Sequence, residues 1–269
     1  MLDRHGKSDL AAQREWLRAS GALPAGAAGT RAFDELQAPL SELAAAREAL
    51  IGMASSAVGE PFEIEVDDLV LTGTLPEHCN GMLVHALLKE AADNRLLQAW
   101  LDYLLLATQR DDAQLVLLEW NDGKLQRRRA RDVSPAPARA WLGDLARQYV
   151  RGQRTPLPFF SKSSYTYAKR RWEKRKNDDD DAAFDAARAA FHSRRFHRGD
   201  DKDPASVLAA RGIDWFDPKS PHGRGFADCA SSVFVPLLST LQKIEPDTGA
   251  AKAKKTTSAS PRSKPRSAT

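Results

Sequence analysis

Residues 94–131 read "NRLLQAWLDYLLLATQRDDAQLVLLEWNDGKLQRRRAR", and this stretch decides the fold class. Its first half places Leu97, Trp100, Leu101, Leu104 and Leu105 on one helical stripe, and flanking leucines widen that stripe until the helix must be mostly buried. Its second half predicts a hairpin made of the strand "AQLVLLEW", the turn "NDGK" and the basic strand "LQRRRAR". A buried helix next to a hairpin predicts an α/β core.

The residues before this stretch predict short strands. "FEIEV", "LVLTGTL" and "MLVHAL" have strand periodicity, and "PEHCNG", with the turn signal Asn80-Gly81, joins the second to the third. We therefore expect these three strands to form a β-meander. Further towards the N-terminus, 8–20 and 31–54 read as helices joined by the Gly/Pro-rich "GALPAGAAG".

Helices are predicted after the stretch. "SPAPARAWLGDLARQYVRG" begins with Ser134 as candidate N-cap and Pro135 at the first helical position. Residues 182–198 read as an Ala-rich helix, and "FADCASSVFVPLLSTLQ" reads as an amphipathic helix interrupted or bent at Pro236.

Composition separates the chain into three parts. We expect a helical lead-in over 1–58, an α/β domain over 59–244 and a disordered basic tail over 245–269. The tail holds six Lys or Arg against one Asp from residue 246 on, which is more positive charge than the net +4 of the whole chain. The sequence pI of about 9.1 therefore reflects the tail, which lacks the aromatic and large aliphatic residues that stabilise an ordered structure.

The remaining composition favours a reducing, cytoplasmic location. The 269 residues have a mean hydropathy of −0.49, no apolar run long enough to cross a bilayer and no signal-peptide core at the start. The two cysteines, Cys79 and Cys229, have neither a zinc-site spacing nor the pattern of a disulfide framework. No "GxxxxGK[ST]" phosphate loop occurs, which excludes ATP hydrolysis by that route.

A basic and aromatic block, "PLPFFSKSSYTYAKRRWEKRKNDDDD", occupies 156–181. Tyr165, Ala168 and Trp172 have the spacing of a core-facing helical stripe, which leaves the basic side chains outside. Packing is the first interpretation, and contact with DNA or a partner protein stays open as the second. The "NDDDD" run is interpreted as a helix start rather than a Mg²⁺ site. The candidate contact residues are Lys162, Lys169, Arg170, Arg171, Lys174 and Arg175.

Three blocks together carry a family resemblance: "RLLQAWLDYLLLATQ", "RGQRTPLPFFSKSSYTYAKRRWEKR" and "GIDWFDPKSPHGRGFADCASSVFVPLLSTLQ". In this order they resemble the C-terminal region of RecC, the gamma subunit of exodeoxyribonuclease V, over roughly residues 8–243. The much larger N-terminal, helicase-like part of that family is absent. The chain therefore resembles a truncated reading frame, a fragment or a free-standing remnant.

The resemblance implies a core like that of PD-(D/E)xK nucleases, in which two carboxylates hold Mg²⁺ and a Lys stabilises developing charge. The expected acid positions fall on Pro76 and His85, and the Lys position falls on Leu87. Glu119 lies on the next strand but has no Lys two residues on. A metal site built from Glu77, His78 and His85 is the less favoured interpretation, because single His and Glu residues at a turn are more often solvated. By spacing, the catalytic motif is missing, and neither a catalytic nor a metal residue is expected.

The resemblance further implies a non-catalytic subunit that scaffolds the beta and alpha subunits and handles or splits duplex and forked DNA in recombinational double-strand-break repair. ATP and Mg²⁺ would be used by those partner subunits, with no cofactor bound here. Three alternatives stay open: an autonomous Mg²⁺-dependent nuclease, an interaction module without a role on DNA, and a non-functional remnant.

Overall fold

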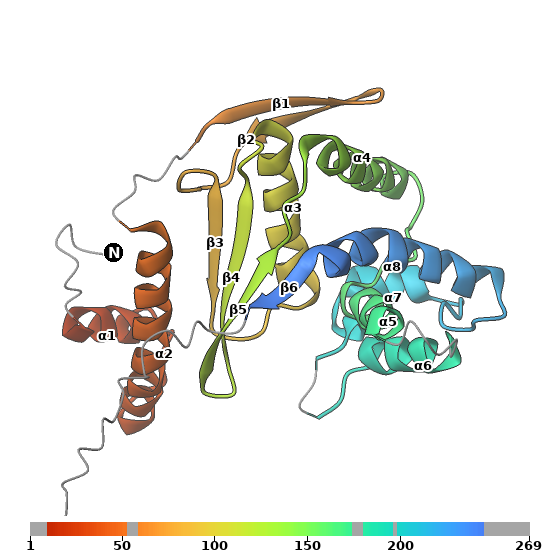
Figure 1. The fold of residues 1–269 in the computed structure, drawn as a ribbon. Coiled ribbons are helices and arrows are strands. Elements are labelled where there is room, and N and C mark those ends of the chain that lie inside the picture. Colours follow the sequence, from red (N-terminus) through yellow and green to blue (C-terminus); the bar gives the residue numbers. More distant parts are fainter. Residues whose placement is uncertain (1–9, 53–58, 174–179, 196–197, 245–269) are drawn as a thin grey trace, which may run out of the picture.

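The computed structural model describes residues 10–52, 59–173, 180–195 and 198–244. Its centre is a mixed sheet with helices on both faces (Figure 1). The strand order is β3 (Met82–Leu87), β4 (Gln114–Asn121), β5 (Lys124–Ala130), β6 (Leu241–Ile244), with β3 parallel to β4 and the other pairs antiparallel. The predicted α/β class is confirmed.

Strand β4 carries an apolar run, Leu115 to Leu118, because helices cover both of its faces. Leu115 and Leu117 belong to the main core with α3 (Asp93–Gln109), whereas Val116 and Leu118 pack on the opposite face against Leu43 of α2 (Ala27–Ile51). Figure 1 shows α2 and α3 on opposite sides of the sheet. The predicted burial of the 93–109 helix is confirmed, since Trp100, Leu104 and Leu106 are at most 1% exposed.

The predicted β-meander is wrong. Strands β1 (Pro61–Val66) and β2 (Leu69–Thr74) form their own two-stranded sheet, and β3 pairs with β4 instead. The reason is burial: β4 needs an apolar neighbour, which "MLVHAL" supplies, whereas β2 leaves most of its residues half-exposed or exposed. The hairpin packs through Ile64 and Val66 on Leu142 of α4 (Pro135–Gly152).

Most helices follow the sequence pattern, but the helix predicted over 182–198 is wrong in its second half, because α6 (Asp180–Phe191) ends at Phe191. Ser134 is the N-cap residue of α4 and Pro135 its first residue, as predicted, although the Ser134 side chain makes no capping hydrogen bond. Helix α8 (Pro221–Thr240) runs through Pro236 without interruption, and strand β6, which was not predicted, follows it. No described helix is long and apolar enough to span a membrane. The remaining helices are α1 (Leu10–Ala19), α5 (Ser161–Glu173), η1 (Asp200–Lys202) and α7 (Pro204–Ala210).

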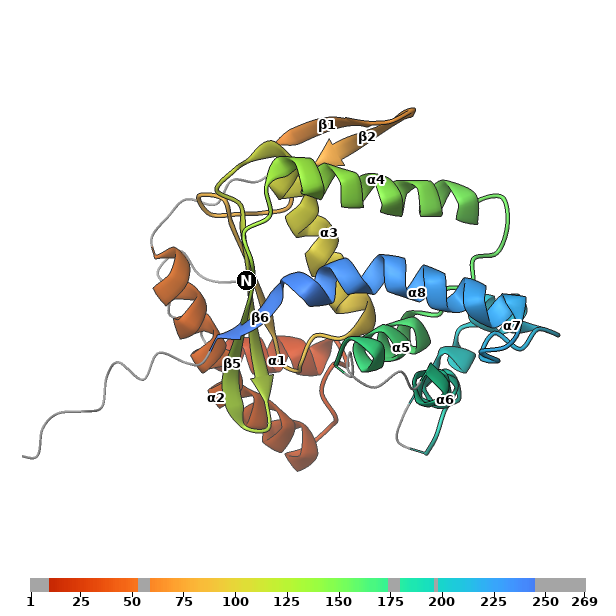
Figure 2. The ribbon, with the colours of Figure 1, turned by 45° about the vertical axis from the view of Figure 1, so that its right-hand side comes forward.

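A second apolar cluster lies away from the sheet, where α5, α6 and α8 come together (Figure 2). Phe160 is 1% exposed at its centre, and its ring lies 5.2–6.4 Å from those of Phe191, Phe216 and Phe226. The "PLPFF" segment therefore packs as an apolar plug between the helices. The predicted tail, 245–269, lies outside the described residues.

Candidate functional site

The degenerate motif positions come together only in part. Pro76, in the loop after β2, and His85, on β3, line one cavity of about 250 Å³, which Asp102 of α3 also lines. Leu87 ends β3 and lines a different groove, on the side of α2. The cavity thus collects two of the three motif positions, but neither of them is an acid.

The polar groups of this cavity form a weak pair rather than a metal centre. His85 Nε2 lies 3.7 Å from Asp102 Oδ2, and burial lowers the pKa of His85 and raises that of Asp102, so both shifts favour the neutral forms. Glu77 forms an ion pair with Arg47 at 3.6 Å. The described part of the chain contains no group of three or more His, Cys, Asp or Glu that could hold a metal ion.

Glu119, the acid on strand β4, forms a structural ion pair with Arg128. Glu119 is 1% exposed, and its Oε1 accepts from Arg128 Nη2 at 2.5 Å and from Ala91 N at 2.6 Å. Arg128 Nε donates to Glu119 Oε2 at 2.8 Å, and its Nη2 also donates to Ala91 O at 2.8 Å. This network ties β4 and β5 to the segment that leads into α3, and it leaves no free carboxylate oxygen for a metal.

A signal in the sequence predicts this pair. Asp122 and Gly123 both have positive φ in a two-residue turn, and the turn aligns Asn121 with Lys124. The same register places Glu119 opposite Gln126, so that Arg128 is its diagonal neighbour on the same face of the hairpin. The register of the "NDGK" turn, followed two residue pairs back, therefore points to Arg128 as the partner of Glu119.

Helix α5 buries the predicted stripe of the basic and aromatic block and leaves basic side chains on its outer face, as the sequence predicts. Tyr165 and Ala168 are buried in the main core, and Trp172 is half-buried. Tyr167, which is not on the predicted stripe, is 4% exposed and packs in the second cluster, 4.9 Å from the ring of Phe184. The aromatic rings of this block thus serve packing on two sides of the helix.

The basic residues of α5 differ in how far they are engaged. Lys169 forms an ion pair with Glu90 at 3.7 Å, and Arg171 forms one with Asp180 at 2.9 Å. Lys162 Nζ donates to the backbone oxygen of Arg198. Arg170 is exposed and makes no ion pair with a described residue. The last two candidates, Lys174 and Arg175, lie outside the described residues.

A buried carboxylate that sequence reasoning missed closes the start of α5. Asp200 is 7% exposed, and its oxygens accept from the backbone nitrogens of Ser163 at 2.9 Å and Lys162 at 3.2 Å, and from Ser163 Oγ at 2.7 Å. Asp200 therefore acts as an N-terminal cap supplied from a distant segment. Its distance of 37 residues from Ser163 explains why no local capping pattern reveals it.

Comparison with known proteins agrees with the resemblance. A family model described as the RecC C-terminal domain matches residues 1–172. The chain belongs to this family. Subunits named "RecBCD enzyme subunit RecC" from two strains of Mycobacterium tuberculosis, CDC 1551 / Oshkosh and ATCC 25618 / H37Rv, are each 31% identical over 206 residues. Each match covers 75% of this chain and 18% of the relative, so the chain spans about a fifth of the length of these RecC subunits.

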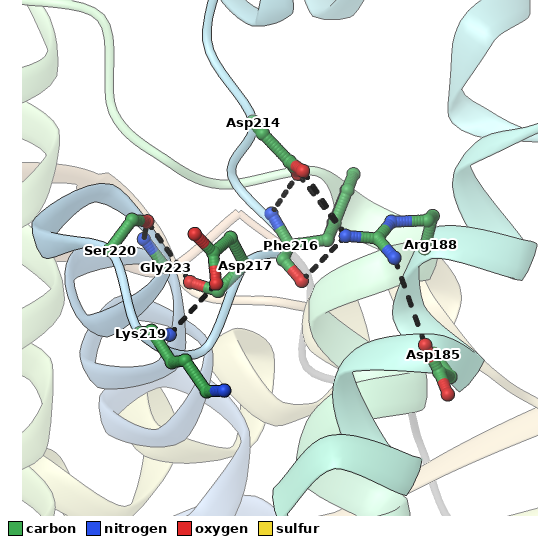
Figure 3. Close-up of polar contacts among 8 residues, drawn as sticks. All are labelled: Asp185, Arg188, Asp214, Phe216, Asp217, Lys219, Ser220 and Gly223. Atoms are coloured by element: carbon green, nitrogen blue, oxygen red, sulfur yellow. Dashed lines mark hydrogen bonds and ion pairs between the residues drawn. The ribbon is translucent and has the colours of Figure 1, made fainter.

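The third block that carries the RecC resemblance lies beyond the part matched by the family model; it comprises the connection into α8 (Figure 3) and α8 itself. Arg188 of α6 donates to Phe216 O at 3.0 Å and pairs with Asp214 at 3.2 Å. Ser220 Oγ caps α8 by accepting from Gly223 N at 2.8 Å. A Cβ on Gly223 would lie 1.9 Å from Asp217 O, so only glycine fits there. The polar residues of this RecC-like block hold a connection in place.

Proposed function

We propose that this RecC-family chain is a non-catalytic part of an exodeoxyribonuclease V type helicase-nuclease, active in recombinational repair of double-strand breaks in the cytoplasm. Its role is to scaffold partner subunits equivalent to the beta and alpha subunits and to handle or split duplex DNA. Family membership carries this proposal, and the Mycobacterium tuberculosis relatives are named as RecC subunits of the RecBCD enzyme.

The chemistry of the nuclease-like positions supports a non-catalytic role. In the proposal, Pro76, His85 and Leu87 occupy the positions of the two acids and the Lys of a PD-(D/E)xK nuclease, and both carboxylate oxygens of Glu119 accept hydrogen bonds from Arg128 or Ala91. A mixed sheet flanked by helices is compatible with a nuclease-like core. In the proposal, the partner subunits bind the ATP and Mg²⁺ of the assembly, and this chain binds neither.

The outer face of α5 is the proposed DNA contact. Arg170 is exposed, and the ion pair of its neighbour Lys169 with Glu90 is about two-fifths exposed on both sides. Such an exposed pair holds its charges weakly, and a phosphate can replace the carboxylate at little cost. Contacts of this kind position a duplex without reading its sequence.

A gel-shift assay tests the proposal with a forked duplex, Mg²⁺ and the chain assembled with its beta and alpha subunits. We expect Lys169→Glu/Arg170→Glu to weaken binding about tenfold and to reduce the salt slope by about two units, one for each lost phosphate contact. The matched control is Arg139→Glu/Arg211→Glu, which reverses two exposed cations on other elements and should bind as the wild type does.

Two results contradict the proposal. Degradation of linear duplex DNA by the purified chain with Mg²⁺ alone would show that it is an autonomous nuclease. A forked duplex that migrates the same with and without this chain, in the presence of the partner subunits, would show that it has no role on DNA.

A further inference from the structure

A groove with an aliphatic floor lies between α2 and the segment that joins β3 to α3. Its volume is about 690 Å³, and four leucines line it: Leu40 and Leu43 from α2, Leu87 at the end of β3 and Leu88 directly after it. Leu40 is 50% exposed and Leu88 is 38% exposed, whereas Leu43 is buried and anchors α2 on the sheet. The groove therefore exposes apolar surface at a point where the fold itself is already packed.

Three cations border the same groove. Arg47 shares its charge with Glu77 at 3.6 Å, but Lys89 and Arg95 are exposed and make no ion pair with any residue that the structure describes. No carboxylate is among the residues that line the groove. The nearby acid Glu90 turns to Lys169 instead. The groove thus has an apolar floor and a cationic rim, and none of its lining residues supplies a negative charge to neutralise the cations.

We propose that this groove binds an amphipathic helix of a partner protein, with aliphatic side chains along one stripe and carboxylates beside it. The leucines of the floor accept the stripe, as in other helix-in-groove interfaces, and Lys89 and Arg95 pair with the flanking carboxylates. A nucleic acid fits this surface less well, because the groove has no aromatic ring to stack on a base and its leucine floor offers nothing to a phosphate. The proposal does not rest on the DNA contact of α5.

The test uses the full chain and a synthetic helical peptide of about four turns, with Leu at i, i+3, i+4 and i+7 spacing and Glu beside the stripe. Fluorescence anisotropy measures its binding. A peptide of the same composition in permuted order, which loses the stripe, is the peptide control. We expect the striped peptide to bind at least tenfold more tightly than the permuted one.

Two groove variants separate the floor from the rim. Leu40→Glu and Lys89→Glu/Arg95→Glu each change exposed residues, and we expect each to weaken binding of the striped peptide at least tenfold. The control Arg139→Glu/Arg211→Glu reverses two exposed charges elsewhere and should bind as the wild type does. Unchanged circular dichroism and melting of each variant confirm that the fold is intact.

Four outcomes would overturn the proposal. They are no binding of the striped peptide, equal binding of the permuted peptide, groove variants that match the control, and displacement of the peptide by a single-stranded oligonucleotide. Sedimentation adds a fifth: a dimer of the chain that both groove variants dissociate would assign the groove to a second copy.

Discussion

The buried pair of Glu119 and Arg128 offers the sharpest test of how this fold is held together. Arg128→Met leaves a carboxylate that is 1% exposed and that keeps one donor among the described residues, Ala91 N, at 2.6 Å. Removing one partner of a buried ion pair costs about 3–5 kcal/mol, because the other charge stays buried without compensation. Glu119→Leu should cost a similar amount, since within the described part of the chain it leaves the Arg128 guanidinium with one hydrogen-bond acceptor, Ala91 O, at 2.8 Å.

The double variant distinguishes two contributions to the free energy of unfolding: the cost of an unpaired buried charge and the net contribution of the ion pair. Glu119→Leu/Arg128→Met removes both charges but leaves the N–H and C=O of Ala91, which is 0% exposed, without these partners. Each unpaired buried group costs about 1–3 kcal/mol, so the double variant should lose less than the two single variants added together. We expect a coupling free energy of at least about 1 kcal/mol between the two positions.

Urea denaturation measures the free energies of unfolding, with an unchanged m value as the check on two-state behaviour. In a thermal scan, about 3–5 kcal/mol corresponds to a melting temperature lower by roughly 6–20 °C for a domain of this size. The control Arg129→Met makes the same chemical change at the next residue, whose pair with Asp132 is exposed, and should cost less than about 1 kcal/mol. The reasoning is refuted if Arg128→Met costs as little as the control, or if the double variant is additive.

Three further predictions concern other contacts. Gly223→Ala should destabilise the chain by about 1–3 kcal/mol, because its Cβ would lie 1.9 Å from a backbone oxygen, whereas Gly225→Ala in the same helix meets nothing within 4 Å; equal melting temperatures would contradict this. Asp200→Ala should cost about 1–2 kcal/mol by uncapping α5, and hydrogen exchange should quicken in its first turn; unaltered exchange there would argue against the cap. Asp102→Asn should lower the pKa of His85 still further, because its charge raises that pKa and only desolvation would remain; an NMR titration in which the His85 pKa stays or rises would disprove it.

Local pattern was sufficient for most elements of the fold. The apolar stripe that includes Trp100 and Leu104 predicts a buried helix, and Ser134-Pro135 predicts the first residues of α4. Both predictions succeed because each depends on residues within one or two helical turns of each other. The pairing of β3 was predicted wrongly, since parallel pairing across a crossover depends on which neighbour buries more apolar surface. Strand β6 was missed because four residues after a helix carry too little periodicity.

The candidate sites show the same difference between what local sequence patterns predict and what contacts between distant residues decide. Two residues that looked chemical within a linear motif have a structural partner elsewhere: Glu119 pairs with Arg128, and Lys162 donates to the backbone oxygen of Arg198. By contrast, the groove of Leu40, Lys89 and Arg95 corresponds to no motif, because Leu40 precedes Lys89 by more than forty residues in the sequence and only the fold brings them to one groove. A motif search finds residues that are close in sequence. When such residues are buried, the fold commonly uses their polar groups in internal hydrogen bonds and ion pairs. Surfaces that remain available to a partner are therefore better sought among exposed side chains that the fold leaves without compensation.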